Sequence, residues 1–436
     1  MSGPPRVVGI VAGGGSLPRE IAEHVQASGD TVHIVALRGE SDTDLSGLPV
    51  TYVGWAQIGG MLRALRNAGV TELVIAGAVR RPDLTQIRPD AGFFLNLPAV
   101  ARIVASGGDD SVLSRVVRFF ESQGFKVVSP AAVAPPVVVA EGALGAVAPR
   151  PEDMVDIAHG FEAIRALGPF DVGQAVVVTE GRIEAIEGVE NTDAMLARVV
   201  LQRRANDGGI GSRRGILVKR PKPGQEMRVD IPAIGPGTVA RAVEAGLSGV
   251  AVLAGGALAL ERPELIRAAD TQGLFIVGAS DRGAAMPAAG AASSSATPFV
   301  RVGTVRPTPR QLSDAARGAA LLNALQPLRD SGGVVIDRGH VLGVECGEGV
   351  AALIARAGAL RQWGRRRWRG RSAIAVVSEA VAGDLASVMA AAAAAHLAGI
   401  AVVGRSPSEL AHGMEPAERY KLFLLAAPPQ GGGAWA

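Results

Sequence analysis

Cationic and acidic residues gather in one loop near the middle of the chain. An apolar run of strand type, residues 216–218, leads directly into Lys219, Arg220 and Lys222. A stretch broken by proline and glycine follows, in which Asp230 stands between two apolar residues. Cations beside a loop that ends in one carboxylate suit an anionic substrate, with or without a divalent metal. Read alone, the same residues also fit a solvated loop in front of an ordinary helix.

A second polar group flanks a predicted β-hairpin. Residues 175–179 and 182–187 are expected to pair as two strands around a Glu-Gly turn. Gln174, Glu187 and Glu190 are expected to lie near the same edge of this hairpin. Because both glutamates recur in a later copy of the segment, a structural part is favoured for them.

The next helix is expected to begin at Asn191, Thr192 and Asp193 and to run to about residue 204. Free N–H groups at a helix N-terminus favour anions, so Thr192 and Asp193 are candidates to bind phosphate or metal. Simple capping by Asn191 or Thr192 is the alternative. Asp109 and Asp110 present the same choice earlier in the chain, between metal or ribose contacts and an ordinary helix cap.

A glycine-rich turn follows the first apolar segment. Residues 6–12 are of buried-strand type, a helix is expected to about residue 27, and residues 31–37 form a second strand. This order is typical of the mononucleotide-binding half of a doubly wound sheet, although the third glycine of the dinucleotide fingerprint is missing. The turn offers backbone N–H groups to a phosphate or a uridine-side group, or is simply a tight strand–helix connection. Its residues are Gly13, Gly14, Gly15 and Ser16.

The composition excludes several classes of function. The chain of 436 residues suits two or three domains. Its 44 basic and 41 acidic residues are too evenly balanced for nucleic-acid binding by bulk attraction. None of the six histidines pairs with Asp, Glu or Cys at a zinc-site spacing. The single cysteine, Cys346, excludes an internal disulfide framework, fits a reducing compartment and is expected in the core.

One apolar segment requires a test for membrane insertion. Residues 385–403 are nearly all apolar, but they are built mostly on alanine, contain His396 and break at Gly399. A helix followed by a strand explains them better than a membrane span. The N-terminus also lacks the pattern of a secretory signal peptide. We therefore expect a soluble protein of the cytoplasm.

The pattern of elements predicts an α/β protein with several domains. A doubly wound, Rossmann-like N-terminal domain is followed by a hinge and a mixed α+β second domain, and a linker rich in Ala, Ser, Gly and Pro leads to a partial copy of the second domain. The predicted boundaries are 1–130 for the first domain, 131–145 for the hinge, 146–283 for the second domain, 284–297 for the linker and 298–436 for the copy.

The C-terminal copy repeats the hydrophobic frame of the second domain and changes its polar residues. Residues 324–327 correspond to 166–169, and residues 334–339 correspond to 176–181. Thr192 and Asp193 become Val350 and Ala351, and the loop that carries Lys222 and Asp230 has no counterpart. We interpret the copy as degenerate, keeping the frame and lacking the chemistry.

These motifs together resemble the LpxI family of UDP-2,3-diacylglucosamine pyrophosphatases. The resemblance runs over residues 6–278, and its specificity lies in the order and spacing of motifs that are weak one by one. In chain order they are 12–18 (AGGGSLP), 76–77 (AG) with 81–83 (RPD), 108–110 (GDD), 171–174 (DVGQ), 190–195 (ENTDAM), and 222–225 (KPGQ) with 230–232 (DIP). The chain departs from the family in its last 150 residues and at Asn191, where the family pattern has glycine.

The resemblance implies hydrolysis of UDP-2,3-diacylglucosamine to 2,3-diacylglucosamine 1-phosphate (lipid X) and UMP, in lipid A biosynthesis. It implies a divalent metal, Mg²⁺ or another such as Mn²⁺, attack of water on the sugar-side phosphorus, and a substrate held between two hinged domains. Asp230 aligns with the essential aspartate of the family, which could deprotonate water, hold the metal, or both. Asp193 is the second expected metal ligand. The expected substrate-binding residues are Gly13, Gly14, Gly15, Ser16, Gln174, Asn191, Thr192, Asp193 and Lys222.

Two other functions stay open beside hydrolysis. One is a nucleotide- or lipid-binding regulatory protein that keeps the two-domain form without turnover, against which the intact Thr192, Asp193, Lys222 and Asp230 argue. The other is a nucleotidyltransferase, suggested by the glycine-rich loop, which product analysis would separate from a hydrolase.

A run of arginines with two tryptophans, residues 361–371, suits anionic headgroups at a membrane surface. A solvated loop is the alternative, and nucleic-acid binding has thin support without a fold motif. Because the acyl chains of the substrate must leave water, we expect transient, peripheral association with the inner membrane. The expected partners are thus UDP-diacylglucosamine and that membrane surface, with no nucleic acid, and a homo-oligomer stays open.

Overall fold

The computed structural model describes residues 6–79, 88–104, 109–207, 213–281, 299–328, 332–361, 370–379 and 384–428. Contacts divide the chain into two compact units. The N-terminal unit contains the chain up to residue 142 together with residues 224–239 and 253–271, and the C-terminal unit contains the remainder. The division therefore differs from the predicted boundaries, because part of the predicted second domain packs with the first.

The N-terminal unit is built on a five-stranded parallel sheet of order β3-β2-β1-β4-β5. This order and the glycine-rich turn after β1 confirm the predicted Rossmann-like arrangement. The strands are β1 Val7–Ala12, β2 Thr31–Leu37, β3 Val50–Val53, β4 Glu72–Ala76 and β5 Lys126–Val127.

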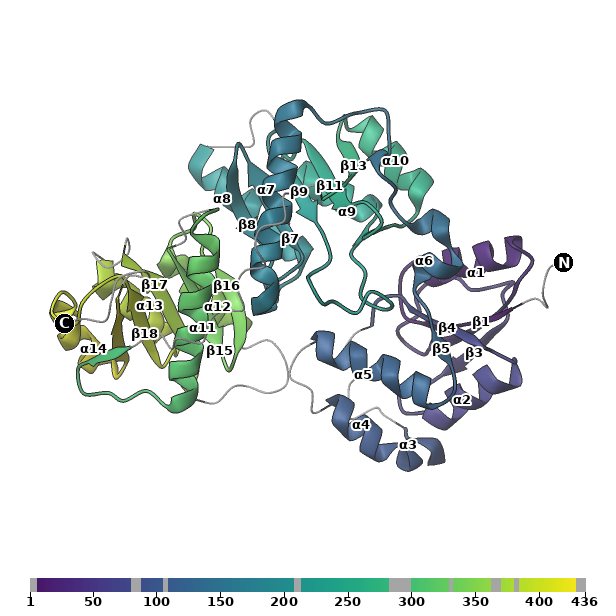
Figure 1. Cartoon of the computed structure of the whole chain (residues 1–436), viewed down its shortest axis with the longest axis horizontal. Helices are drawn as coiled ribbons and strands as arrows, with labels where there is room; N and C mark the ends of the chain where they lie inside the picture. Colours follow the sequence, from purple (N-terminus) through teal and green to yellow (C-terminus); the bar gives the residue numbers. More distant parts are fainter. Residues whose placement is uncertain are drawn as a thin grey trace. The chain divides into compact units, whose positions relative to one another are not determined.

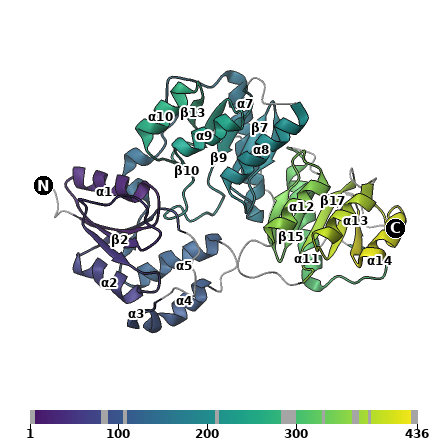
Figure 2. The same ribbon diagram turned by 180° about the vertical axis from the view of Figure 1, so that it is seen from behind.

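Alternate residues of these strands enter two separate cores, because successive side chains of a strand point to opposite faces. Ile10 and Ile34 pack on the face covered by α1 and α6, whereas Val11 and Val35 pack on the face covered by α2 and α5. Figure 1 and Figure 2 show these two helical layers on either side of the sheet. The helices of the unit up to this point are α1 Leu17–Ala27, α2 Ile58–Asn67, α3 Ala91–Leu95, α4 Leu97–Val104, α5 Asp109–Ser122 and α6 Pro130–Val133.

Residues 131–145, the predicted hinge, contain ordered structure. Val133 and Ala134 are buried in the core beside α1, and the short helix η1 (Pro135–Val137) follows α6. Val138 then forms a bridge with Leu258 of β12 (Leu258–Ala259), which pairs in parallel with β10 (Ala233–Ile234). These pairings attach segments from later in the chain to the N-terminal unit.

The C-terminal unit contains two six-stranded sheets with the same topology. The sheet of order β6-β13-β11-β9-β7-β8, with its helices, is here named copy A, and the sheet of order β14-β19-β18-β17-β15-β16, with its helices, is named copy B. The strands of copy A are β6 Gly142–Ala143, β7 Ala175–Thr179, β8 Arg182–Ile186, β9 Ile216–Lys219, β11 Gly249–Leu253 and β13 Phe275–Ala279. Those of copy B are β14 Val300–Val302, β15 Gly333–Asp337, β16 His340–Val344, β17 Ile374–Ser378, β18 Gly399–Val403 and β19 Phe423–Ala427.

Corresponding helices follow corresponding strands in the two copies. α7 packs on β7 and β9, and α11 packs on β15 and β17. The helices of the first series are α7 Pro151–Leu167, η2 Gly168–Phe170, α8 Thr192–Asp207 and α9 Pro236–Glu244, whereas α10 Arg262–Thr271 belongs to the N-terminal unit. Those of the second series are α11 Pro309–Leu325, α12 Val350–Leu360, α13 Leu385–Ala394, η4 Ala411–Gly413 and α14 Met414–Tyr420.

The repeat extends to single hydrogen bonds. Asp156 of α7 accepts bonds from the N–H groups of residues 180 and 181 in the β7–β8 turn, at 3.0 and 2.7 Å. Asp314 of α11 accepts the same two bonds from residues 338 and 339, at 3.0 and 2.8 Å. Both hairpins also shift register at the equivalent place. The structure thus confirms the predicted repeat, which reproduces the six-stranded sheet of the second domain and not the sheet of β10 and β12.

A buried arginine anchors each copy in the same way. Arg203 pairs with Glu184 and donates to the carbonyls of residues 214, 245 and 246. Arg361 pairs with Asp337 and donates to the carbonyls of residues 370, 395 and 396. Arg361, counted with the cationic run 361–371, is therefore a core residue of copy B. Among the described residues, no helix has both the length and the apolar character needed to cross a bilayer.

Candidate active site

One edge of the copy A sheet collects the polar residues of three strands. The start of β7 lies beside the end of β9, since Ala175 pairs with Lys219. The end of β8 reaches the same edge, where the N–H of Glu187 donates to the carbonyl of Ala175 at 2.9 Å. Gly173 makes this approach possible, because a Cβ there would lie 2.6 Å from the side chain of Glu187.

Glu187 is the centre of the hydrogen bonds at this edge, with 6% of its surface exposed. Its carboxylate accepts bonds from the N–H of Gln174 at 2.8 Å and from Oγ1 of Thr192 at 2.7 Å. The carbonyl of Gln174 in turn accepts from the N–H of Arg220 at 3.1 Å. The structure therefore brings together Gln174 and Glu187, which were expected at one hairpin edge, and adds Thr192 from the start of α8.

Lys219 is buried in the same cluster, with 6% of its surface exposed. Burial lowers the pKa of its ammonium group, while the negative charges of Glu187 and Asp193 act to raise it. The buried amino group of Lys219 therefore lies within the electrostatic influence of two carboxylates. The sequence identified Lys219 only as one of several basic residues near Asp230, because the pairing of β9 with β7, which sets Lys219 opposite Ala175, joins segments that are distant in the chain.

The start of α8 explains Asn191. Its backbone is in the left-handed region, with a φ of 79°, which asparagine tolerates better than most residues. Its Oδ1 accepts a hydrogen bond from the N–H of Ala194 at 3.1 Å, so the residue also caps the helix. Copy B has Gly349 at the equivalent position, with a φ of 81°. Glycine and asparagine are therefore exchangeable here for one conformational reason.

Lys222 lies just beyond β9 and is held by an acidic partner. Its Nζ is 2.5 Å from the Asp171 carboxylate, and 13% of the lysine side chain is exposed against 46% of the aspartate. Asp171 belongs to a motif that the sequence singled out, but its pairing with Lys222 was not predicted. A phosphate that binds Lys222 must compete with this carboxylate or share the ammonium with it.

A second ion cluster fixes the backbone beside Lys222. Asp281 accepts from Arg220 at 2.5 Å and from Arg165 of α7 at 2.6 Å. Burial alone would raise the pKa of Asp281, but the hydrogen bonds and charges of the two arginines outweigh it and lower the pKa. Arg220 also lies over the Phe161 ring, 5.9 Å from its centroid. Arg220 therefore acts as a structural cation.

Asp230 lies in the N-terminal unit, in the loop that precedes β10. On one side of it Val229 packs against the core under α2 and α5, and on the other Ile231 packs against the core under α1. The loop thus passes from one face of the sheet to the other at Asp230. Asp230 is half-buried, and its position in the loop is fixed by the packing of Val229 and Ile231 in two different cores.

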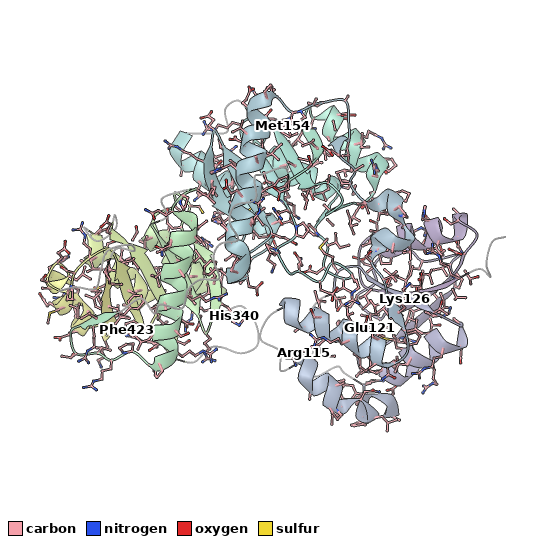
Figure 3. The ribbon with its side chains drawn as sticks, viewed as in Figure 1. Arg115, Glu121, Lys126, Met154, His340 and Phe423 are labelled. Atoms are coloured by element: carbon pink, nitrogen blue, oxygen red, sulfur yellow. The ribbon has the colours of Figure 1, made fainter. Side chains whose placement is uncertain are left out.

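An arginine clamp holds the same loop. Arg228 bonds to Glu226 at 2.7 Å and to Glu121 at 2.6 Å, and Figure 3 labels Glu121 on α5. Hydrogen bonding to Arg228 lowers the pKa of Glu226. The N–H of Asp230 donates to the carbonyl of Glu226 at 3.0 Å. The backbone at Asp230 is therefore tied to α5 through two ion pairs.

The glycine-rich turn uses its N–H groups inside the protein. Those of Gly13 and Gly14 donate to the carbonyls of Ala76 and Ala78, at 2.8 and 2.7 Å, and that of Gly15 donates to Asp42 at 2.8 Å. A Cβ at Gly13 would lie 2.3 Å from the carbonyl oxygen of Ala78, so close packing of two loops accounts for this glycine. In this structure the turn matches the tight strand–helix connection, the second of the two predicted readings.

Ser16 differs from the three glycines before it. Its Oγ is buried and has no hydrogen-bond partner among the described residues. The residue precedes α1, yet its side chain does not cap that helix. Of the four residues predicted in this turn, Ser16 is the one with a side-chain hydroxyl, and that hydroxyl is buried.

The predicted metal ligands, Asp193 and Asp230, lie in different units, on copy A and on the N-terminal unit. In the described parts of the chain, no three His, Cys, Asp or Glu side chains form a cluster that could hold a metal ion. Mg²⁺ commonly takes one or two carboxylates and completes its shell with substrate phosphates and water. The carboxylates of Asp193 and Asp230 are donors of that kind.

Copy B shows what the same fold looks like without these polar groups. Strand register places Val377 at the position of Lys219. Val350 and Ala351 begin α12 where Thr192 and Asp193 begin α8. The carboxylate equivalent to Glu187, that of Glu345, accepts instead from the N–H groups of residues 332, 347 and 349. The frame therefore folds without the lysine, threonine and aspartate, which points to another use for them.

Some predicted positions lie outside the described residues. These are residues 81–83, Gly108, the side chains of Asp109 and Asp110, the linker 284–297 and most of the arginine-rich run. Of that run, Arg371 donates to the carbonyls of Tyr420 and Lys421, so like Arg361 it serves the fold. Cys346 is buried, as predicted.

Comparison with known proteins gives two family matches and one curated relative. The model of the LpxI N-terminal domain matches residues 7–137, and that of the LpxI C-terminal domain matches residues 140–277 and 300–379. The UDP-2,3-diacylglucosamine pyrophosphatase LpxI of Caulobacter vibrioides is 41% identical over 273 residues, which cover 63% of this chain and 97% of that protein. The second segment of the C-terminal match lies in copy B, in agreement with the repeat.

A solved structure from Methylobacillus flagellatus, assigned to the NAD-dependent epimerases/dehydratases, is 12% identical and covers 46% of this chain and 71% of its own. Its TM-score of 0.17 is too low to support any conclusion on fold or function.

Proposed function

Because the chain belongs to the LpxI family, we propose that it hydrolyses UDP-2,3-diacylglucosamine to 2,3-diacylglucosamine 1-phosphate and UMP, in lipid A biosynthesis. The observation that carries the proposal is its 41% identity to a UDP-2,3-diacylglucosamine pyrophosphatase over 97% of that protein's length. The polar cluster of copy A supports it, because a cationic edge suits a diphosphate and copy B folds without one.

In the proposed reaction, positively charged groups of the C-terminal unit bind the negatively charged diphosphate. Lys222 contacts a phosphate oxygen in exchange for Asp171, and the first turn of α8 adds the positive end of the helix dipole. Lys219 stays inside and orients Asp193 and Glu187 by its charge. Neutralising the diphosphate lowers the repulsion that a negatively charged nucleophile would meet.

Asp230 is the proposed general base. It takes a proton from water, the water oxygen bonds to the sugar-side phosphorus, and the bond from that phosphorus to the bridging oxygen breaks, so that UMP leaves with the bridging oxygen. Asp230 and Lys222 are eight residues apart in the chain, so the intervening segment limits their separation to at most about 28 Å.

We propose a divalent metal, Mg²⁺ or Mn²⁺, held by Asp230 and Asp193 together with phosphate oxygens. When bound, such an ion would polarise the phosphoryl oxygens and lower the pKa of a coordinated water. The proposal predicts that EDTA abolishes turnover and that Mg²⁺ restores it.

Substitution of Asp230 tests the assignment of the base. Asp230→Asn keeps the shape of the side chain and removes the base, so release of UMP should fall at least about 1000-fold while the unfolding midpoint stays unchanged. Glu264→Gln in the same unit, which breaks an exposed ion pair with Arg267, is the control and should leave the rate unchanged. Turnover of Asp230→Asn close to that of the wild type would remove Asp230 from the mechanism.

The identity of the products separates the alternatives. In H₂¹⁸O the label should enter the sugar 1-phosphate and not UMP, since water attacks the sugar-side phosphorus in the proposed reaction. Transfer of a nucleotide to an acceptor would identify a nucleotidyltransferase. Tight binding of UDP-2,3-diacylglucosamine without any UMP would identify the regulatory, non-catalytic form.

We further propose cytoplasmic action with peripheral binding to the inner-membrane surface, through the arginines at positions 365, 366, 367 and 369. Replacing all four by serine should weaken binding to vesicles that contain anionic lipid at least about tenfold, because each basic residue contributes up to about 1 kcal/mol near such a surface. A matched control replaces Arg405 and Arg419, which form exposed ion pairs in copy B. Equal binding by both variants and the wild type would end this part of the proposal.

A further inference from the structure

Copy A and copy B meet through corresponding elements. α7 contacts α11, its own equivalent, and Arg317 of α11 lies over the ring of Phe170 at the end of copy A's first helical segment, 5.6 Å from its centroid. On the adjoining hairpins, a Cβ at Gly188 would lie 3.2 Å from the carbonyl oxygen of Leu342. A surface that covers its own equivalent is the mark of an isologous contact, the kind found between two identical subunits.

The charges at this contact belong to one network of equivalent residues. Arg198 pairs with Glu190 inside copy A at 3.1 Å, and Arg356 pairs with Glu348 inside copy B. Arg356 also reaches Glu190 across the contact at 3.4 Å. The side chains of these four residues are between 7% and 18% exposed, so the network is removed from water. Opening the contact would leave it partly unpaired, which is costly for buried charges.

We propose that copy B is a built-in partner: within one chain it occupies the face of copy A through which two copies of this domain would otherwise pair. The loss of Lys219, Thr192 and Asp193 equivalents in copy B fits this role, because a partner needs the frame and not the chemistry. Covalent linkage favours the internal contact over pairing with another chain, since it raises the effective concentration of copy B. The wild-type chain should therefore leave no such face open to a second chain.

The contact also borders the candidate site. Glu190, which Arg356 binds, directly precedes Asn191 and the start of α8, and Gly188 follows Glu187. Copy B thus supports the turn that leads into the polar cluster. This inference does not rest on the proposed function, because the mass of the chain and its hydrogen exchange can be measured without any turnover.

The experiment uses the full chain and substitutions in copy B only. Arg317→Glu combined with Arg356→Gln removes the ring contact and the bond to Glu190. Sedimentation velocity should give the mass of one chain, 44.5 kDa, for the wild type, and a mass that rises with concentration for the variant, as opened faces pair between chains. Amide hydrogen exchange over residues 184–191 should accelerate at least about tenfold. Arg405→Gln with Arg419→Gln, on exposed ion pairs of copy B, is the control and should match the wild type in both measurements.

Exchange and mass like those of the control would overturn the proposal. So would a wild-type dimer that falls to single chains in the variant, because the face would then pair between chains. If the double variant does not fold, Arg317→Ala alone replaces it, with the same exchange readout and the same two contrary outcomes. Absence of UMP release by the wild type would refute the proposed function and leave these results intact.

Discussion

Burying Lys219 costs the folded state free energy, because its ammonium group loses water and burial lowers its pKa. Such a cost is expected at a functional residue and is unnecessary for a structural one. Copy B demonstrates this, since Val377 fills the equivalent place with no exposed surface. At the level of single residues, copy A and copy B can therefore be compared as one fold with the polar cluster and the same fold without it.

Transplanting the residues of copy B into copy A tests this comparison. The variant Thr192→Val, Asp193→Ala, Lys219→Val should fold, with a free energy of unfolding within about 2 kcal/mol of the wild type, since the lost Thr192 hydrogen bond and the relieved lysine desolvation offset each other. Release of UMP should fall at least about 1000-fold. Urea unfolding and product assays measure the two effects separately.

The reverse pattern would contradict the role given to Lys219. A variant that unfolds several kcal/mol more easily, yet turns over normally when folded, would make the cluster a structural ion network. Leu247→Ala, a buried position of copy A outside the cluster, supplies the control for a purely structural loss. It should lower stability by about 2–5 kcal/mol and leave turnover per folded molecule unchanged.

At the level of elements, the start of α8 depends on the conformation of one residue. Asn191 combines a left-handed backbone with a side-chain cap. Asn191→Ala should lower the free energy of unfolding by about 1–3 kcal/mol, because it loses the cap and strains the backbone. Asn191→Gly should lower it by less than about 1 kcal/mol, since glycine adopts this conformation freely. Urea denaturation of the three proteins gives the comparison, and equal losses for alanine and glycine would contradict it.

The elements themselves could be predicted from the sequence, because apolar periodicity and glycine placement determine them locally. The hairpin of β7 and β8 and the strands β1 and β2 agree with their predicted ranges to within a few residues. Which elements pack together could not be predicted in the same way. The segment around Asp230 joins the N-terminal unit through Val229, Ile231 and the pairing of β10 with β12, contacts that are distant in sequence.

The same limit applies to the candidate site. Residue types and order predicted that Gln174 and Glu187 lie near one hairpin edge, since the hairpin brings them there. The partners of the basic residues were missed, because Asp171 reaches Lys222 and Asp281 reaches Arg220 only in the folded sheet. Both interpretations of the glycine-rich turn stayed open because the sequence cannot reveal that the neighbouring loop at Ala78 and the carboxylate of Asp42 accept hydrogen bonds from its N–H groups.

At the level of the whole molecule, the chain contains two copies of one fold, but it is predicted to have a single substrate-binding site. Copy B has Val350, Ala351 and Val377 where copy A has its polar cluster, so one chain should bind one substrate molecule. The Asp230→Asn variant, which prevents turnover, can be titrated calorimetrically with a short-chain UDP-2,3-diacylglucosamine, and the expected stoichiometry is one per 44.5-kDa chain. The transplant variant should show no binding at the same concentrations. Two equivalents bound per chain would mean that copy B binds substrate through residues other than those of copy A, and the interpretation of copy B as a frame without chemistry would fail.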